Sequence, residues 1–285
     1  MIRWFAESAR ALPWREPETS AWGVLTSEVM LQQTPVARVA PIWTQWMQRW
    51  PTPARMADSS QSDVLRAWGK LGYPRRAMRL HACATAIATN HADVVPADVE
   101  TLLGLPGIGA YTARAVACFA YGQRVPVVDT NVRRVISRAI HGAAQVGAIS
   151  TARDLADAER LLPGQASRAA VFSAAVMELG ATVCTARAPD CAHCPLRTEC
   201  RWVLAGKPLG PEQRRPTQRY AGTDRQVRGR LLDVLRGSTS PVEKTELDVA
   251  WTVDPLQRDR ALDSLLTDGL VEQTAAGLFA LAGEG

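Results

Sequence analysis

The spacing of apolar residues predicts a helical body over most of the chain. Up to about residue 205, apolar side chains recur at intervals of three and four residues, and Pro, Gly, Ser and Asp interrupt them where helices would begin or end. A sustained two-residue alternation, the pattern of a half-buried strand, is missing from this stretch. We therefore expect an all-α body, with helical stretches at 27–30 running into 36–50, and at 62–71, 75–89, 99–103 and 112–121.

The last quarter of the chain predicts a separate small module. Residues 206–221 are rich in Gly, Pro and Arg without apolar periodicity, so we expect a linker there. Three further helical stretches follow at 225–236, 244–251 and 255–270, and then a short hairpin with its turn at 275–277. This order predicts a winged-helix-like α+β module over residues 222–285.

The charge of the chain is unevenly distributed. The formal net charge is +5, but residues 222–285 contain 7 basic and 11 acidic side chains. A polyanion would therefore bind mainly to the first 221 residues, and the charge of the tail favours a packing or protein-contact module over a DNA reader. The longest apolar stretches fall far short of the roughly 20 residues of a membrane helix, and the start has no apolar signal-peptide core. We expect a cytoplasmic protein without membrane contact.

Four of the six cysteines lie within 17 residues and have the spacing of metal ligands. They form the pattern C-x6-C-x2-C-x5-C at Cys184, Cys191, Cys194 and Cys200. Four thiolates at such spacings suit tetrahedral zinc or a cubic iron–sulfur cluster. Structural zinc sites usually use two close pairs of ligands, whereas here one close pair is flanked by longer gaps, which favours a cluster and leaves zinc open. His193 is interpreted as a bystander, and Cys83 and Cys118 as core residues.

The segment LPGIGAYT at 105–112 predicts a hairpin between two helices. Gly107 and Gly109 allow a tight turn whose backbone N–H groups point outward at the start of the next helix, which is a ready phosphate site. A turn selected only for helix packing remains the alternative. A basic run nearby supports phosphate binding, although a solvated helix face would look similar. The run consists of Arg66, Lys70, Arg75, Arg76 and Arg79.

Two carboxylates are flanked by apolar residues in the sequence and are candidate catalytic residues. Glu28 lies in VLTSEVMLQQT, and Asp129 follows the apolar run VPVV. Buried carboxylates are costly unless they are paired or used. A purely structural role stays open for each of them, and for Asp129 that role is a helix N-cap, because DTNV opens a helical stretch.

Taken in order, these motifs resemble the endonuclease III superfamily of DNA glycosylases, and within it the MutY-type adenine glycosylases. The resemblance covers roughly residues 4–205 and rests on seven segments. They are LPW at 12–14, SEVMLQQT at 27–34, LGY at 71–73, LPGIGAYT at 105–112, VDTNVRRV at 128–135, MELGATVC at 177–184 and the four-cysteine signature. The signature implies a [4Fe-4S] cluster by resemblance, which the spacing alone does not establish.

The resemblance also implies a fold and a site. The fold would have a cluster lobe made of residues 1–19 and 127–205, and a six-helix lobe with a helix-hairpin-helix at 20–126. Glu28 would protonate a flipped-out adenine, Asp129 would stabilise the cationic sugar, and Tyr111 and Asn131 would support them. The residues expected to contact double-stranded DNA are Gln33, Tyr73, Gly107, Gly109, Arg75 and Arg76. The substrate would be adenine opposite 8-oxoguanine or guanine, and the enzyme a nucleoid-associated monomer.

Several positions depart from the family pattern. The place of the strand-cutting Lys of the endonuclease III branch is taken by Tyr111, which cannot form a Schiff base, so we expect a monofunctional enzyme. Thr130 stands where the family usually has Gly, Pro74 replaces a second Tyr, and the tail does not resemble the usual 8-oxoguanine-reading domain. A related glycosylase with another target base and a non-catalytic iron–sulfur DNA-binding protein are the alternatives.

Overall fold

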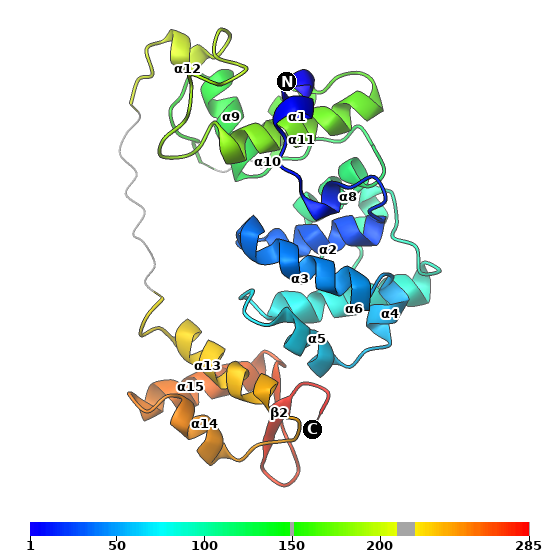
Figure 1. Cartoon of the computed structure of the whole chain (residues 1–285), viewed down its shortest axis with the longest axis vertical. Coiled ribbons are helices and arrows are strands. Elements are labelled where there is room, and N and C mark those ends of the chain that lie inside the picture. The colour runs from blue at the N-terminus through cyan, green and yellow to red at the C-terminus, as the bar shows by residue number, and fades with distance from the viewer. Residues whose placement is uncertain (149–150, 210–219, 285) are drawn as a thin grey trace. The chain divides into compact units, whose positions relative to one another are not determined.

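The computed structural model describes residues 1–148, 151–209 and 220–284, and these contain fifteen α-helices, one short 3-10 helix and a two-stranded sheet (Figure 1). The mostly helical body predicted from the sequence is confirmed. Most of the linker predicted at 206–221 lies outside the described residues. In the described ranges, none of the helices has the length and apolar character needed to cross a membrane.

The chain divides into two compact units. The first, here called the cysteine unit, contains Met1–Leu25, Ala97–Gly104 and Ile108–Arg214. The second, here called the tail unit, contains Thr26–Pro96, Leu105–Gly107 and Arg215–Gly285. The lobe boundaries expected from the sequence stay a prediction.

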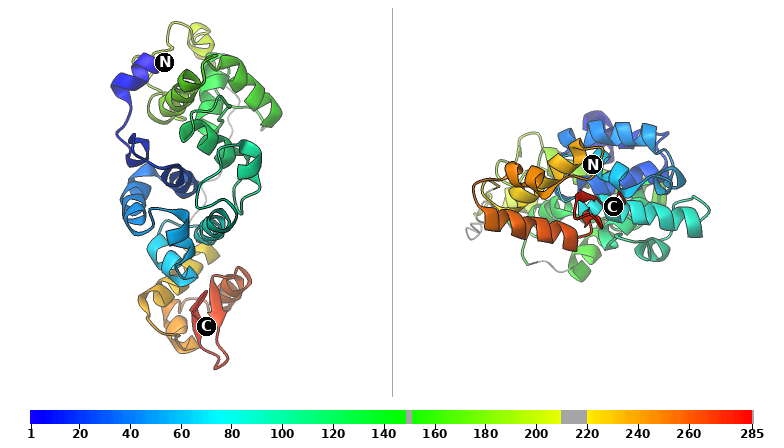
Figure 2. Two further views of the ribbon diagram at one scale, coloured as in Figure 1. Left: turned by 90° about the vertical axis from the view of Figure 1, so that its right-hand side faces the viewer. Right: turned by 90° about the horizontal axis from the view of Figure 1, so that it is seen from below.

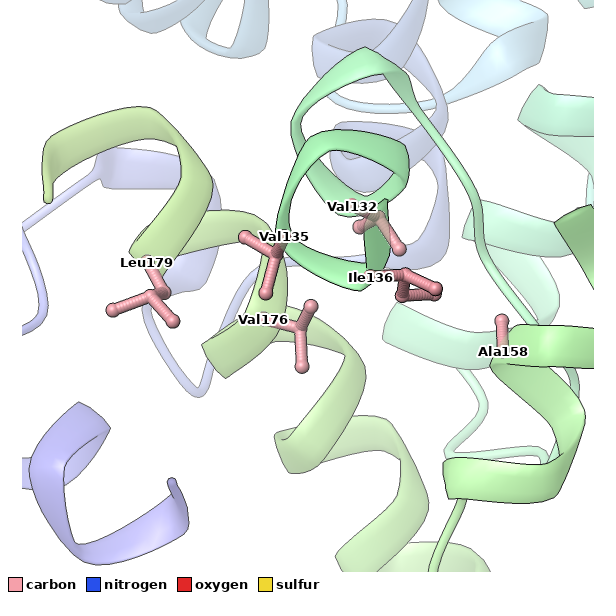
Figure 3. Packing of buried hydrophobic residues seen from close by; sticks show 6 residues of the cluster. All are labelled: Val132, Val135, Ile136, Ala158, Val176 and Leu179. Carbon is pink, nitrogen blue, oxygen red and sulfur yellow. The ribbon is translucent and has the colours of Figure 1, made fainter. Parts of the chain in front are cut away.

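The cysteine unit is built around helices that pack against one another. Its elements are α1 (Ile2–Ser8), η1 (Pro13–Arg15), α7 (Val99–Leu103), α8 (Ala110–Phe119), α9 (Thr130–Ala139), α10 (Thr151–Leu161), α11 (Ala166–Thr182) and α12 (Arg201–Leu204). Apolar side chains from α9, α10 and α11 form one buried cluster (Figure 3). The cluster comprises Val132, Val135, Ile136, Ala158, Val176 and Leu179. Burial of each large apolar side chain there contributes roughly 1.5–3 kcal/mol.

Gly180 allows α9 and α11 to approach closely. A side chain at this position would place its Cβ 2.7 Å from the Cβ of Asn131 and 2.8 Å from the carbonyl oxygen of the same residue. Neither distance is possible without a shift of one helix. The glycine of the MELGATVC segment is therefore required by packing beside Asn131.

The tail unit combines a helical part with the C-terminal module. Its elements are α3 (Val36–Arg49), α4 (Pro53–Ala57), α5 (Gln61–Trp68), α6 (Arg75–Asn90), α13 (Asp224–Gly237), α14 (Lys244–Ala250), α15 (Pro255–Thr267), β1 (Val271–Gln273) and β2 (Phe279–Leu281), and α2 (Ala21–Leu31) spans the boundary between the units. Trp46 forms edge-to-face contacts with Trp50 and Trp68, at centroid distances of 4.8 and 5.5 Å. These three indoles are fully buried and fill the centre of the helical part.

The C-terminal module has the predicted winged-helix-like order of three helices and a hairpin. Strands β1 and β2 are antiparallel, with Val271 opposite Leu281, and Val242 forms a further bridge to Phe279. In Figure 2 the red hairpin lies beside the orange helix α15, with which β1 is in contact. Helix α13 and strand β2 also contact α5, so the module packs on the helical part of its unit.

The boundaries of the predicted helices agree with the structure except in the first stretch, where α2 begins at Ala21 and not at residue 27. Helices α5, α6, α7 and α8 begin and end within three residues of the predicted stretches. The stretch predicted to run from 27 into 50 is instead divided into α2 and α3 by residues 32–35. Pro35 explains the break, because it lacks an N–H and disfavours a helical conformation in the preceding Thr34.

Candidate functional site

Asp129 is held by hydrogen bonds at the start of α9. Its carboxylate accepts the backbone N–H of Val132 at 2.7 Å and the side-chain amide of Asn131 at 2.7 Å. Burial raises the pKa of Asp129, although the hydrogen bonds from Val132 and Asn131 act in the opposite direction. The residue is the N-cap of α9, as one interpretation of the sequence held, and it is also a desolvated carboxylate with restricted geometry.

Arg134 connects Asp129 to the cysteine loop. Its guanidinium donates to Oδ1 of Asn131 at 2.7 Å, to the carbonyl of Gly180 at 2.6 Å and to the carbonyl of Cys184 at 2.7 Å. Since the amide of Asn131 in turn donates to Asp129, a continuous hydrogen-bonded chain runs from the first cysteine of the signature to the carboxylate. No local sequence pattern singles out Arg134.

Glu28 lies on α2 and is buried, with 8% of its surface exposed. Its neighbours Leu25, Val29 and Met30 are also buried, which is the apolar setting expected from the sequence. Tyr111 lies in the first turn of α8 in the cysteine unit. Its half-buried ring packs against a cluster formed by Ala115, Cys118 and Val127.

Gln33 and Tyr73 both occupy the left-handed region of backbone conformation. Their φ angles are 56° and 50°, which non-glycine residues seldom adopt. Such conformations cost about 1–3 kcal/mol each and persist only when the surroundings enforce them, often at functional sites. The sequence predicted that these two residues contact DNA but contained no sign of their backbone strain.

Arg76 enforces the conformation of both loops. The sequence predicted a basic side chain available to DNA, but the structure buries it, with 8% of its surface exposed. The guanidinium donates to five oxygen atoms, which belong to Val29, Met30, Gln32, Thr34 and Gly72. Burial lowers its pKa to about 10. Arg76 therefore joins the loop of Gln33 to the loop of Tyr73. Its guanidinium is buried and is not exposed for contact with phosphate.

The other members of the basic run are largely paired with acids of the C-terminal module. Arg66 forms an ion pair with Glu284, Lys70 with Asp233 at 3.4 Å, and Arg75 with Asp268 at 3.1 Å. Arg79 is exposed. The acidic residues of the tail thus neutralise part of the run that the sequence assigned to phosphate binding.

Glycine is present at the two hairpin positions for different structural reasons. Gly107 has a φ of 76°, and a Cβ there would lie 2.7 Å from the Cβ of Arg79, so only glycine fits. Gly109 is the N-cap of α8 with an ordinary φ, and no described atom lies within 4 Å of the place of a Cβ. The missing side chain leaves the N–H groups at the start of α8 accessible.

The four signature cysteines lie between the end of α11 and the start of α12. Arg138, which is buried, donates to the carbonyl of Thr185 at 2.7 Å and lies 3.4 Å from the Sγ of Cys184. His193 bonds to Asp190 at 2.7 Å, in keeping with the role of a bystander. Within the described ranges, no three metal-ligating side chains converge closely enough to hold a metal ion.

The donor set nevertheless fits a thiolate-bound metal centre. Burial raises the pKa of the Cys194 thiol, and the nearby Cys184, Cys200 and Cys191 thiols raise it further, so the four sulfur atoms are close enough to interact. Thiols must lose their protons to bind metal. The guanidinium of Arg138 donates a hydrogen bond to the Sγ of Cys184 at 3.4 Å.

Glu178 was missed by the sequence interpretation. Its side chain is fully buried on α11 and accepts hydrogen bonds from Arg10 at 2.6 and 2.9 Å and from Arg15 at 2.8 Å. Burial alone would raise its pKa, but the hydrogen bonds from the two arginines outweigh it and lower the pKa to about 2. A carboxylate within an apolar helix, the signal that identified Glu28, was also present here.

Proteins with similar sequences are adenine DNA glycosylases. The chain is 65% identical to the enzyme of Mycolicibacterium smegmatis, and the match covers all of this chain and 96% of that protein. It is 63% identical to the enzyme of Mycobacterium tuberculosis, with 100% and 93% covered. The Homo sapiens enzyme is 40% identical over 209 residues, which are 70% of this chain and 38% of that protein.

Solved structures of similar fold include a thermostable thymine-DNA glycosylase and endonuclease III bound to DNA. The first has a TM-score of 0.64 and 26% identity, and covers 72% of this chain and 93% of that chain. The second has a TM-score of 0.60 and 20% identity, with 72% and 92% covered, and shows the fold alone. A family model described as HhH-GPD superfamily base excision DNA repair protein matches residues 26–157. The full-length identity confirms the resemblance seen in the motifs, and the chain belongs to the adenine DNA glycosylase family of the HhH-GPD superfamily.

Proposed function

We propose that the protein hydrolyses the N-glycosidic bond of adenine mispaired with 8-oxoguanine or guanine in double-stranded DNA, as a monofunctional enzyme. The observation that carries the proposal is the carboxylate of Asp129, desolvated and held by Asn131 and the Val132 amide, in a chain related over its full length to adenine DNA glycosylases. An ordinary N-cap needs neither the burial nor the second amide donor.

Glu28 would act as the general acid. Adenine leaves poorly as an anion, so the ring must gain a proton, which we assign to N7, before the bond to the sugar breaks. For this step the carboxyl of Glu28 would have to be neutral, and its side chain lies among apolar neighbours. General acids of this kind contribute about 10²–10⁴ in rate.

Asp129 would stabilise the positive charge that develops on the sugar. It would also serve as a transient nucleophile or as the partner of the attacking water, as paired carboxylates do in glycosidases. Asn131 and Arg134 fix its orientation through the hydrogen-bonded chain, and Tyr111 would support the intermediate. The phenol of Tyr111 offers no amine for a Schiff base, which is why strand cleavage is not expected.

The loops joined by Arg76 would handle the DNA helix. Enzymes that act on a base extrude it from the stack at a cost of a few kcal/mol. Gln33 and Tyr73 would fill or wedge the vacated stack, and Arg76 would serve this step by holding both loops. The N–H groups after Gly107 and Gly109, together with Arg75, would bind phosphates.

The four signature cysteines would hold a [4Fe-4S] cluster, which when bound supplies cross-linking of the loop and no step of the hydrolysis. Arg138 and Arg134 would brace the loop from its inner side.

Single-turnover cleavage of four duplexes tests the proposal. Each carries one adenine, opposite 8-oxoguanine, guanine, cytosine or thymine, and each reaction is divided and analysed with and without alkali. We expect abasic sites opposite 8-oxoguanine and guanine, cut only after alkali. Equal rates on all four duplexes would contradict the mispair specificity, and cleavage without alkali at the rate of base removal would contradict monofunctionality.

A further inference from the structure

Tyr73 is contacted by a residue that lies far from it in the sequence. Its ring is 39% exposed and follows Gly72, at the tip of the loop between α5 and α6. The guanidinium of Arg225, from the first turn of α13, lies 4.2 Å from the ring centroid. Nη1 of Arg225 also donates to the Tyr73 hydroxyl at 3.0 Å. Arg225 therefore makes two interactions with this partly exposed aromatic side chain, and the guanidinium of Arg76 lies 5.5 Å from the same ring centroid.

The position of Arg225 is fixed by the packing of its helix. At the other end of α13, Arg236 donates to the carbonyl of Leu65 at 3.1 Å, and Arg66 donates to the carbonyl of Ser238 at 2.6 Å. Asp224 is the acid adjacent to Arg225, but it is bonded to Arg260 and is not its partner. Arg225 is thus presented to Tyr73 by a helix anchored on α5.

We propose that Arg225 is a positioning residue, which holds the ring of Tyr73 in the orientation that enters the DNA stack beside the flipped adenine. The inference rests on the proposed function. A free exposed tyrosine samples several rotamers, and ordering one rotamer-rich side chain on binding opposes association. The cation over the ring and the hydrogen bond to its hydroxyl order the side chain beforehand.

This role assigns the C-terminal module a part in DNA handling that its net charge did not indicate. The module would act on DNA through Tyr73 and would not need a basic face of its own. Arg225 is a cation, however, and any arginine near DNA attracts phosphate. The test must separate positioning of the ring from this general attraction.

Four single variants, one double variant and one control make the separation. Arg225→Ala removes both interactions, Arg225→Lys keeps the charge, Tyr73→Phe keeps the ring without the hydroxyl, and Tyr73→Ala is made alone and together with Arg225→Ala. Arg230→Ala is the matched control, because Arg230 is another exposed arginine of α13 and lies over Trp251 instead, at 5.5 Å. Thermal melting of each variant reports on folding.

Two readouts are used. One is the single-turnover rate of adenine removal divided by the dissociation constant, for adenine opposite guanine. The other is the fluorescence rise of 2-aminopurine placed beside the opposite guanine, which reports unstacking on binding. We expect Arg225→Ala to lower both, the first by about three- to tenfold, with Arg225→Lys and Tyr73→Phe intermediate and Arg230→Ala within about twofold of wild type.

The double variant tests whether Arg225 acts through Tyr73. If Arg225 acts through Tyr73, Arg225→Ala has no further effect once Tyr73 is Ala. A full additional loss in the double variant, or equal losses for Arg225→Ala and Arg230→Ala, would overturn the inference, as would a wild-type complex without a fluorescence rise. If wild type removes no adenine, the proposed function fails, while the fluorescence arm still measures the effect of Arg225.

Discussion

At the scale of single residues, Asp129 is held where its charge is costly. Burial raises its pKa above the ordinary 3.8, so the folded protein favours the protonated form more than the unfolded chain does. Asp129 therefore contributes most to stability at pH below the ordinary value, and that contribution is lost as the pH rises through the folded pKa. At neutral pH the charged carboxylate lowers the stability that the rest of the fold provides.

Replacing Asp129 by Asn should thus make the protein more stable and inactive. Asn still caps α9 but carries no charge to desolvate, so we expect a gain of about 1 kcal/mol at pH 7, seen as a rise in Tm. The gain should shrink as the pH falls through the folded pKa, because Asp129 then becomes neutral too. Thermal melts over a pH series provide the measurement, and an Asn variant less stable than wild type at pH 7 would contradict the account.

The pKa of Glu178 is shifted in the opposite direction from that of Asp129. Its pKa is lowered from 4.5 to about 2, so its contribution is present above pH 4.5 and is lost as the pH falls towards 2. We expect Glu178→Gln to lower the free energy of unfolding by about 2 kcal/mol at pH 7, because Arg10 and Arg15 lose their buried partner. The gap to wild type should narrow below pH 4.5.

Denaturant unfolding at several pH values measures the effect of Glu178→Gln. Glu7→Gln is the control, since Glu7 is an exposed acid of α1 in the same unit. A Glu178→Gln variant that resembles the control at pH 7 would show that the ion pair with Arg10 and Arg15 does not stabilise the unit.

At the scale of elements, the cysteine loop depends on its metal centre. The described chain between the end of α11 at Thr182 and the start of α12 at Arg201 has no helix or strand. Metal binding would then supply much of its folding energy. We expect purified protein to be yellow-brown with about four iron atoms per chain, and Cys191→Ser or Cys194→Ser to lower the iron content and the soluble yield.

Cys83→Ser is the matched control for these variants, because Cys83 is a buried cysteine that does not belong to the signature. It should keep the iron content of wild type. Stoichiometric zinc in protein prepared without oxygen would contradict the assignment of an iron–sulfur cluster.

The sequence was informative where a local pattern sets the structure. Helix α6 was predicted at 75–89 and observed at Arg75–Asn90, because its apolar spacing is regular and Pro74 precedes its first residue. The order of elements in the C-terminal module followed from the same spacing. The break between α2 and α3 was missed although Pro35 marks it, since the apolar pattern continues on both sides.

The environment of site residues was less predictable. Arg76 was interpreted as a surface cation because five basic residues occur close together, yet three of its carbonyl partners lie at or just after the end of α2, more than forty residues away. Long-range packing of this kind leaves no local pattern. Glu178 could have been found by the argument used for Glu28, whereas the link from Arg134 to Cys184 required the fold.

At the scale of the whole molecule, the acidic module and the basic run balance each other within the tail unit. Asp268 is placed between Arg75 and Arg228, at 3.1 and 2.6 Å. Exposed ion pairs contribute little to stability, but each one neutralises a cation that would otherwise attract phosphate. The net charge of the tail therefore acts on DNA affinity through residues outside the tail.

Freeing Arg75 should tighten DNA binding. We expect Asp268→Asn to lower the Kd for duplex DNA by about two- to fivefold at low salt, with the difference disappearing at high salt. Asp263→Asn is the control, because Asp263 is an exposed acid of α15, the helix that Asp268 caps at its C-terminal end. Fluorescence anisotropy across a salt series gives the comparison, and equal effects of the two variants would show that only net charge matters.

Direct detection of free adenine is the most direct test of whether the protein removes adenine through Glu28 and Asp129. Wild type, Glu28→Gln and Asp129→Asn are each incubated in excess over a duplex carrying adenine opposite guanine, and the released base is quantified by mass spectrometry alongside the DNA affinity. We expect adenine from wild type only, with both variants reduced by at least about 10² in rate and nearly unchanged in binding. A Glu28→Gln variant that releases adenine at more than about a tenth of the wild-type rate would contradict the proton transfer assigned to Glu28.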